Sequence, residues 1–226
     1  MNRKKIEIIP AILPMTFSEI EDRVSFVVGK VKSVQVDICD GKFVPNATWP
    51  CRKPDDTFNK IIKEEEGMPK WKELNYEFDL MVNDPETMVE YWVSAGASRI
   101  VIHIEAKSDV SKAIDLLQGK VEIGLALAVD TSLKSIELFR DRIQFIQLMG
   151  IDNVGFQHQS FDDKVLGRIR EARTMYPEFP ISVDGAVSLE TAPLLIDSGV
   201  DRLVIGSAIW NTDNPVAAVD KFKKLQ

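Results

Sequence analysis

The sequence predicts a closed (β/α)8 barrel, built as a single domain over residues 1–226. Three observations support this fold class. Short apolar segments alternate with segments of helical periodicity from one end of the chain to the other, and eight such pairs follow one another in one series. No glycine-rich G-x-G-x-x-G turn follows the first strand, which argues against an open dinucleotide-binding sheet. A chain of 226 residues is long enough to bury a full core.

The predicted strands share short runs of Val, Ile, Leu or Phe, which suit a parallel sheet buried on both faces. They are Ile6–Leu13, Ser33–Ile38, Glu77–Val82, Arg99–Ile104, Val121–Leu127, Ile143–Met149, Ile181–Val183 and Arg202–Ile205. The second strand is followed by a long charged segment, residues 49–76, which predicts one helix and a loop with a solvated face.

Local signals mark where the helices begin. Residues 16–19 (TFSE) resemble a capping box, and residues 188–190 (SLE) do so less completely. Residues 84–85 and 214–215 each place a capping residue before a proline, which is favoured in the first helical turn. These signals place a helix start after the first, third, seventh and eighth predicted strands.

Composition excludes several classes of function. The net charge of −7 and a pI near 5.0 argue against a protein that binds nucleic acid or an anionic membrane surface. No apolar stretch approaches the length of a membrane span. Cys39 and Cys51 are the only cysteines and form no C-x-x-C pair, so we expect two free thiols in a cytoplasmic protein.

Polar residues interrupt the apolar strands where catalytic groups of such a barrel lie. In "VQVDICDGKFVPN" (34–46), Gln35 and Asp37 share one face of the strand, and Asp40 begins the turn that follows. Asp79 and Asp184 also lie at or near strand ends, and a barrel brings such ends together. Three neighbouring carboxylates repel one another, which raises their pKa values or calls for a cation.

Several motifs together resemble the ribulose-phosphate 3-epimerase family. They are "IIPAILPMTF", "VQVDICDGKFVPN", "FDLMVNDPE", "GLALAVDT", "VDGAV" and "SGVDRLVIGSAIW", in the same order and with similar spacing, over Ile6 to Leu225. The resemblance implies a TIM barrel of the ribulose-phosphate-binding type. It also implies an isomerase of pentose phosphate and carbohydrate metabolism that interconverts ribulose 5-phosphate and xylulose 5-phosphate by moving a proton at C3.

The resemblance assigns roles to residues of this chain. Asp37 and Asp184 match the acid/base pair, one removing the C3 proton to give an enediolate and the other returning a proton on the opposite face. Substrate-binding positions are implied at Met81, Met149, Gly155, Gly185, Ala186, Gly206 and Ser207. Cys39 stands where the family has a third methionine.

The metal site of the family is altered in this sequence. Two histidines are expected beside the two aspartates, and Gln35 and Asp79 stand in their places. A site of Gln35, Asp37, Asp79 and Asp184 would hold a divalent metal through oxygen atoms, with Mg, Mn or Fe favoured over Zn, or no metal at all. The chain's two histidines, His103 and His158, match neither ligand position, and we interpret His103 as a core histidine.

Other departures affect the substrate pocket. Ala11 replaces a serine and Lys42 replaces a histidine of the family pattern. Residues 157–158 (QH) occupy the place of a glycine pair whose backbone N–H groups would approach a phosphate, and Ala186 replaces another glycine. "GSAIW" (206–210) is intact, so the phosphate site is half kept.

Three functional hypotheses remain. The first is an epimerase-like isomerase that acts on a phosphorylated sugar and forms a homo-oligomer through barrel faces. The second is a catalytically inactive barrel that binds a phosphorylated metabolite or a protein partner. The third is decarboxylation or aldol cleavage through an enolate, which is least favoured because Lys42 follows both aspartates of "DICDGK" instead of lying between them.

Overall fold

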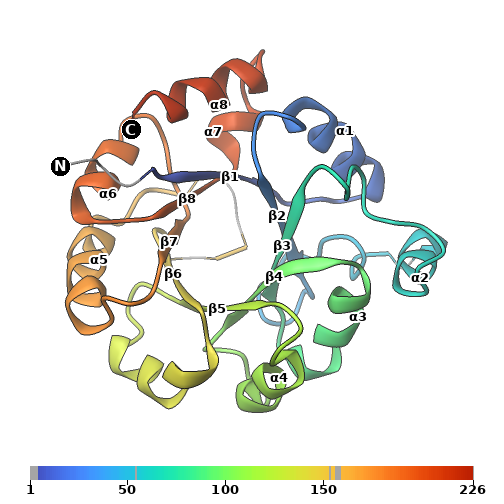
Figure 1. The fold of residues 1–226 in the computed structure, drawn as a ribbon, viewed down its shortest axis with the longest axis horizontal. Helices are drawn as coiled ribbons and strands as arrows, with labels where there is room; N and C mark the ends of the chain where they lie inside the picture. Colours follow the sequence, from blue (N-terminus) through green and yellow to red (C-terminus); the bar gives the residue numbers. More distant parts are fainter. Residues whose placement is uncertain (1–4, 54, 153, 156–158, 226) are drawn as a thin grey trace.

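The protein forms a closed barrel of eight parallel strands. The structure, a computed structural model, describes residues 5–53, 55–152, 154–155 and 159–225. Each strand is hydrogen-bonded to the next in chain order, and β1 pairs with β8 to close the sheet. Figure 1 looks into this ring of strands, with the helices arranged around its outside. The predicted barrel is therefore confirmed.

All eight predicted strands are present. They are β1 (Glu7–Ile12), β2 (Ser33–Cys39), β3 (Asn75–Met81), β4 (Ala97–His103), β5 (Glu122–Leu127), β6 (Phe145–Met149), β7 (Ile181–Asp184) and β8 (Arg202–Ile205). Their ends differ from the predicted ends by at most two residues, and β8 matches its prediction at both ends.

The connections between strands contain α-helices and short 3-10 turns. The α-helices are α1 (Phe17–Val27), α2 (Asp56–Ile62), α3 (Val89–Ser94), α4 (Val110–Leu117), α5 (Lys164–Met175), α6 (Ala192–Ser198), α7 (Ser207–Trp210) and α8 (Pro215–Lys223). Short 3-10 turns are η1 (Pro85–Thr87), η2 (Leu133–Leu138) and η3 (Arg140–Arg142), of which η2 and η3 join β5 to β6. Within the described residues, no helix has the length and apolar character needed to cross a membrane.

Two of the predicted helix starts are capped by side chains. Thr16 accepts a hydrogen bond from the backbone N–H of Glu19, and the Glu19 carboxylate accepts one from the backbone of Met15, one residue before the position a capping box requires. Asn214 accepts a hydrogen bond from the backbone N–H of Ala217 at 2.9 Å and begins α8 as predicted.

The other two predicted starts differ in detail. Ser188 accepts hydrogen bonds from the backbone of Glu190 and Thr191, but α6 begins only at Ala192, so this serine caps the turn before the helix. Asp84 precedes a 3-10 turn and makes no capping bond with its side chain. Within 49–76, α2 is the predicted helix.

The two faces of the sheet carry different side chains. Val34, Val36 and Ile38 of β2 point outward into the core between strands and helices. The inward face is largely polar at several strands, where the buried residues are Gln35, Glu77, Asp79, Arg99, His103, Gln147 and Ser182. The prediction of strands buried on both faces is therefore confirmed at these positions, although several of the buried inner residues are polar.

The amino ends of the strands meet in a network of ion pairs. Arg99 contacts Glu7 at 2.8 Å and Glu77 at 3.1 Å, and Arg202 contacts Glu122 at 2.7 Å. We call these five residues the amino-end ion network. Four of its residues, Glu7, Arg99, Glu122 and Arg202, line a pocket at this end, whereas the active sites of such barrels lie at the other end, where the strands terminate.

Candidate active site

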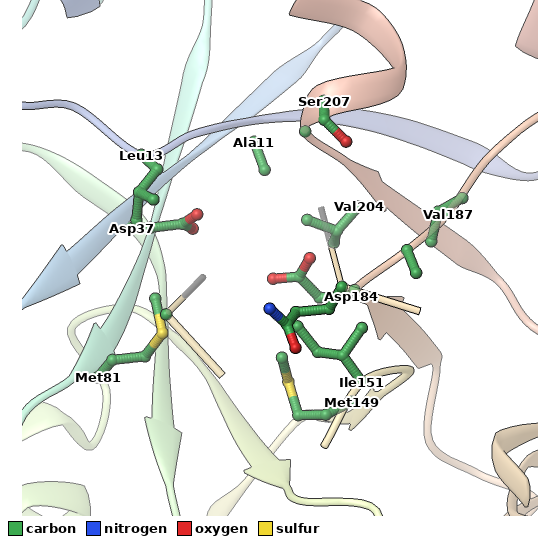
Figure 2. Close-up of a pocket in the computed structure, with 15 residues that line it drawn as sticks. Ala11, Leu13, Asp37, Met81, Met149, Ile151, Asp184, Val187, Val204 and Ser207 are labelled. Carbon is green, nitrogen blue, oxygen red and sulfur yellow. The ribbon is translucent and has the colours of Figure 1, made fainter. Parts of the chain in front are cut away.

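A pocket opens at the carboxyl ends of the strands. Every residue predicted to bind substrate or to transfer protons lines it: Asp37, Met81, Met149, Gly155, Asp184, Gly185, Ala186, Gly206 and Ser207. Figure 2 shows the Asp37 and Asp184 side chains reaching into the pocket from different strands, with Met81 and Met149 nearby. The barrel thus brings together side chains that are far apart in the sequence.

The pocket also contains residues that the sequence did not single out. They are Leu13, Ile151, Gln159, Val187 and Val204, together with Ala11, whose departure from the family pattern was noted. All except Gln159 are apolar and lie on a strand or within three residues of a strand end. Position relative to a strand end was therefore the signal that would have found them.

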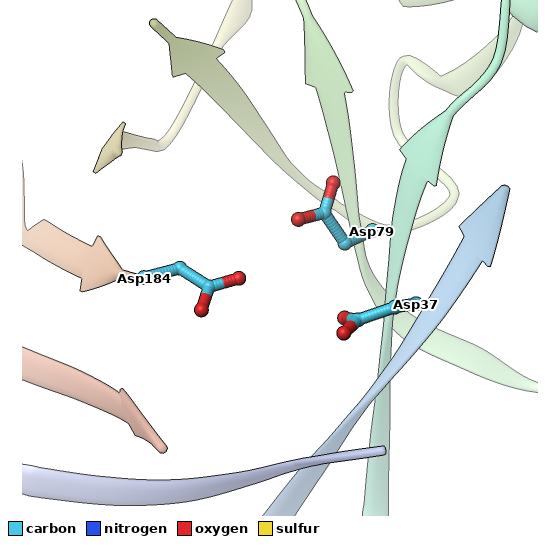
Figure 3. A group of neighbouring side chains, drawn as sticks. All are labelled: Asp37, Asp79 and Asp184. Carbon is cyan, nitrogen blue, oxygen red and sulfur yellow. The ribbon is translucent and has the colours of Figure 1, made fainter. Parts of the chain in front are cut away.

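Three aspartates converge beside this pocket. Asp37 of β2, Asp79 of β3 and Asp184 of β7 each offer an oxygen within 4.8 Å of the others. Figure 3 shows the three carboxylates directed toward a common space. Asp37 and Asp184 lie far closer than the roughly 10 Å beyond which two groups could not serve one carbon atom. Asp79 is fully buried and does not line the pocket.

Gln35 lies between the two pocket aspartates. Its side-chain Nε2 donates to Asp37 Oδ1 at 2.8 Å and to Asp184 Oδ2 at 3.0 Å. The side chain is fully buried, and its Oε1 has no hydrogen-bond partner among the residues that the structure describes. A single neutral amide therefore holds both carboxylates around the same point.

Burial and mutual repulsion raise the pKa values of this pair. Burial is the largest cause for Asp37, followed by the charges of Asp184 and Asp79, and its pKa lies well above the ordinary value. Burial and the charge of Asp79 raise the pKa of Asp184 to about 7, although the hydrogen bond from Gln35 acts in the opposite direction. Near neutral pH, the pair therefore favours one bound proton over two negative charges.

Asp79 is held by donors of its own. His103 Nε2 contacts Asp79 Oδ1 at 3.0 Å, and Gln147 Nε2 donates to Asp79 Oδ2 at 2.9 Å. Burial acts to lower the pKa of His103, but the carboxylates of Asp79 and Glu105 outweigh it and raise that pKa. The interpretation of His103 as a core histidine is confirmed, and its imidazole contacts a carboxylate of the cluster.

The turn after β7 carries local strain at the pocket wall. Gly185 has φ +105° and Ala186 has φ +52°, and the left-handed region costs a residue with a Cβ roughly 1 kcal/mol or more. A Cβ at Gly185 would lie 2.8 Å from Cγ1 of Ile151. Glycine is therefore required at 185, whereas alanine at 186 is accommodated with strain.

Two loops are joined across the pocket mouth. Asp40 accepts hydrogen bonds from the backbone of Lys42, Phe43 and Asn83, which confirms its role in the turn after β2. Asn46 in the same loop donates to the Gly155 carbonyl at 2.8 Å. The predicted replacement of a glycine pair at 157–158, and with it His158, lies outside the described residues.

The family's metal ion does not fit this arrangement as it stands. The aspartate oxygens are close enough together to hold one ion. However, Gln35 directs its N–H hydrogens, not its oxygen, at Asp37 and Asp184, and both Asp79 oxygens already accept hydrogen bonds. A cation needs lone pairs directed at it, and Gln35 and Asp79 do not present them in this arrangement.

Fold and site together define a class of protein: a (β/α)8 barrel with paired buried carboxylates in a pocket at the carboxyl ends of its strands. The fold agrees with solved structures of low sequence identity. KGPDC from Streptococcus mutans superposes with a TM-score of 0.73 at 16% identity, covering 98% of this chain and 97% of that one. For 3-hexulose-6-phosphate synthase from Salmonella typhimurium, the TM-score is 0.67 at 17% identity, with 97% and 98% covered.

Sequence comparison identifies the family within that class. The Ribulose-phosphate 3 epimerase family matches residues 7–210. Ribulose-phosphate 3-epimerase of Bacillus subtilis is 30% identical, covering 96% of this chain and 98% of the relative. The chloroplastic enzyme of Arabidopsis thaliana is 27% identical, covering 98% and 78%. The chain belongs to the ribulose-phosphate 3-epimerase family, as the motifs predicted.

Proposed function

We propose that the chain is an isomerase that epimerises a ketose phosphate at C3, with Asp37 and Asp184 as the proton-transfer pair. One observation carries the proposal: the two carboxylates line the same pocket, from strands on different sides of the barrel, and share one donor. A carbon atom placed between them has a carboxylate on each face. That arrangement permits removal of a proton from one face and return on the other.

The protonation states that the reaction requires are compatible with Asp37 and Asp184. Loss of the C3 proton next to the ketone leaves an enediolate, so the base gains a proton and the acid must already hold one. The raised pKa values of Asp37 and Asp184 allow one to be ionised while the other is protonated near neutral pH. After one turnover the two roles are exchanged, and the reverse reaction restores them.

The remaining pocket residues suit a phosphorylated sugar. Gly185 and Ala186 after β7, and Gly206 and Ser207 after β8, lie on the same side of the barrel, where backbone N–H groups can meet an anionic group. Met149 belongs to the neighbouring β6 and offers an apolar surface to the sugar carbons. We propose ribulose 5-phosphate as the first substrate to test, on the strength of the family.

The test is isotope exchange at C3. Purified protein and ribulose 5-phosphate are incubated in heavy water and followed by NMR, with Mg²⁺, Mn²⁺, Zn²⁺ or chelator added in turn. We expect deuterium at C3, and a rate lower by about 10² to 10⁴ in Asp37→Asn, because that variant removes one acid/base group. The matched control is Asp22→Asn, which changes an exposed aspartate of α1.

Absence of exchange under every condition would refute epimerisation of this substrate. Binding of ribulose 5-phosphate without exchange would then support the inactive-barrel hypothesis, which the departures at Ala11 and Gln35 motivated. Retention of both carboxylates in one pocket is the reason we favour catalysis.

Assembly and location complete the proposal. We propose a cytoplasmic homo-oligomer, from the family and from two cysteines that are free in the structure. The Trp49 side chain is buried against Phe58 and Trp92, whereas Trp71 is 59% exposed. Light scattering on the full chain gives the subunit number, and a monomeric mass would refute this part.

A further inference from the structure

The orientation of the Gln35 amide follows from chemistry. Its nitrogen lies 2.8 Å from one carboxylate oxygen of Asp37 and 3.0 Å from one of Asp184. With one proton shared by the pair, one carboxylate is ionised and its oxygens only accept hydrogen bonds, so it can meet the NH2 group of the amide but not its carbonyl. The opposite orientation would turn the carbonyl of the fully buried Gln35 toward that ionised acceptor.

This orientation and a metal ion exclude each other. An ion bound by Asp37 and Asp184 would lie where the two N–H bonds now point. To admit it, the amide would have to turn by half a rotation, lose both hydrogen bonds and present Oε1, the atom that is now without a partner. Asp79 would likewise have to give up a donor, His103 or Gln147, to offer a lone pair.

We infer that Gln35 replaces the metal ion of the family: its amide holds Asp37 and Asp184 around the reacting carbon, and the centre works without a bound divalent metal. For the reaction, this inference rests on the proposed function. Exclusion of the ion is a separate claim about Gln35 itself. Gln35 is then a positioning residue, because it touches both proton-transfer groups and does not line the pocket.

The first measurement is metal binding by the purified full chain. After dialysis against Mn²⁺ or Zn²⁺, we expect less than stoichiometric metal by elemental analysis and no change of Tm on adding chelator. Gln35→Glu and Gln35→His each replace the donor by a ligand, and we expect at least about tenfold tighter Mn²⁺ or Zn²⁺ binding with a Tm that chelator lowers. Two variants are used so that one that fails to fold does not end the test.

The matched controls are Gln147→Glu and Gln147→His. Gln147 is as deeply buried as Gln35 and points into the same barrel interior, but it donates only to Asp79. We expect neither control to gain a metal ion comparable to that of the Gln35 variants. Equal gain at both positions would overturn the inference, because any added ligand near the cluster would then suffice.

Three further results decide the matter. One tightly held metal per wild-type chain, with a Tm that falls in chelator, would overturn the inference, and so would Gln35 variants that fold but bind no metal. C3 exchange by wild type that is unchanged by chelator, and that becomes dependent on Mn²⁺ in Gln35→Glu, would support it. If wild type shows no exchange at all, the proposed function fails, while metal binding still decides whether Gln35 excludes the ion.

Discussion

The two ends of the barrel interior bury carboxylates in opposite ways. In the amino-end ion network, Glu7 is paired with Arg99 and Arg202, whose charges and hydrogen bonds lower its pKa even though burial alone would raise it. At the carboxyl end, among the residues the structure describes, Asp37 has no lysine or arginine partner and its pKa is raised. The two carboxylates differ in burial and in partners: Glu7 is partly exposed beside two arginines, whereas burial is the largest cause of the raised pKa of Asp37. A paired carboxylate contributes to stability, and an unpaired one becomes available to exchange protons.

Glu77 shows where the two environments meet. It contacts Arg99 at 3.1 Å, yet complete burial outweighs that charge and raises its pKa to about 7. Asp79, two residues further along the same strand, adds to this effect. Glu7 and Glu77 both face Arg99 and Arg202, so proximity to arginine alone does not set the direction of the pKa shift. The difference comes from the complete burial of Glu77 and from the hydrogen bonds of Arg99 and Ser33 to Glu7.

Removing the Arg99 guanidinium from the amino-end ion network should give the largest change in stability. We expect Arg99→Met to lower the free energy of unfolding by about 3 to 5 kcal/mol, because Glu7 and Glu77 lose their shared buried partner. Urea unfolding followed by circular dichroism measures this loss. Arg140→Met, which breaks an exposed pair with Glu178, is the control and should change stability far less. Equal losses would show that the amino-end network is no more important than a surface pair.

At the carboxyl end, removing a buried charge should increase the free energy of unfolding instead of lowering it. The pKa of Asp184 is raised by folding from about 3.9 to about 7, so its contribution to stability is fully present below pH 4 and is lost as pH rises through 7. Asp184→Asn cannot ionise, and we expect it to be more stable than wild type by about 1 to 4 kcal/mol at pH 8, with little difference at pH 4. Urea unfolding at both pH values tests this. A loss of stability at pH 8 would contradict it.

The histidine of the cluster should show an intermediate effect. We expect His103→Leu to destabilise the fold by about 1 to 3 kcal/mol, since Asp79 Oδ1 loses its partner in a fully buried site. The raised pKa of His103 means that its charge stabilises the fold below about pH 6.5 and that this contribution is lost at higher pH. The deficit of His103→Leu should therefore be larger at pH 6 than at pH 9. His103→Gln, which keeps a donor, is the control and should recover part of the loss.

Adding a hydroxyl group to the pocket should give the smallest of these changes, a change in the affinity for ribulose 5-phosphate. Ala11 is buried in the pocket wall, where the family pattern has a serine. We expect Ala11→Ser to tighten ribulose 5-phosphate binding by no more than about tenfold, the value of one hydrogen bond. NMR titration measures the Kd, with the exposed Ala217→Ser as control. Weaker binding would mean that the pocket has no acceptor for the added hydroxyl.

The sequence anticipated the barrel because its signals are local. Each strand is an apolar run, and alternation along β2 correctly separated Gln35 and Asp37 from Val36. The contacts of His103 and Gln147 with Asp79 depend on the register between strands, which no single strand reveals. Gln147 had one local signal, since it lies between two outward-facing residues, Ile146 and Leu148.

The amino-end ion network is a second feature that could not be predicted from the sequence. Glu7 and Arg202 stand at the starts of strands, where charged residues are ordinarily solvated, so their sequence positions suggest exposure. Closure of the ring places them in register across the β1–β8 seam and buries most of both side chains. Which charges meet is a property of the closed ring and not of any one segment.

That seam also has a consequence for the growing chain. Because β1 hydrogen-bonds to β8, the first strand is synthesised before the strand that it pairs with. The Ala11 carbonyl likewise accepts a hydrogen bond from the indole of Trp210, which is synthesised later. Asp37 then faces water on an incomplete sheet, and Asp184 has not yet been synthesised. The chemistry proposed for this pair is therefore absent from every shorter nascent form. It requires the synthesis of β8 and its pairing with β1.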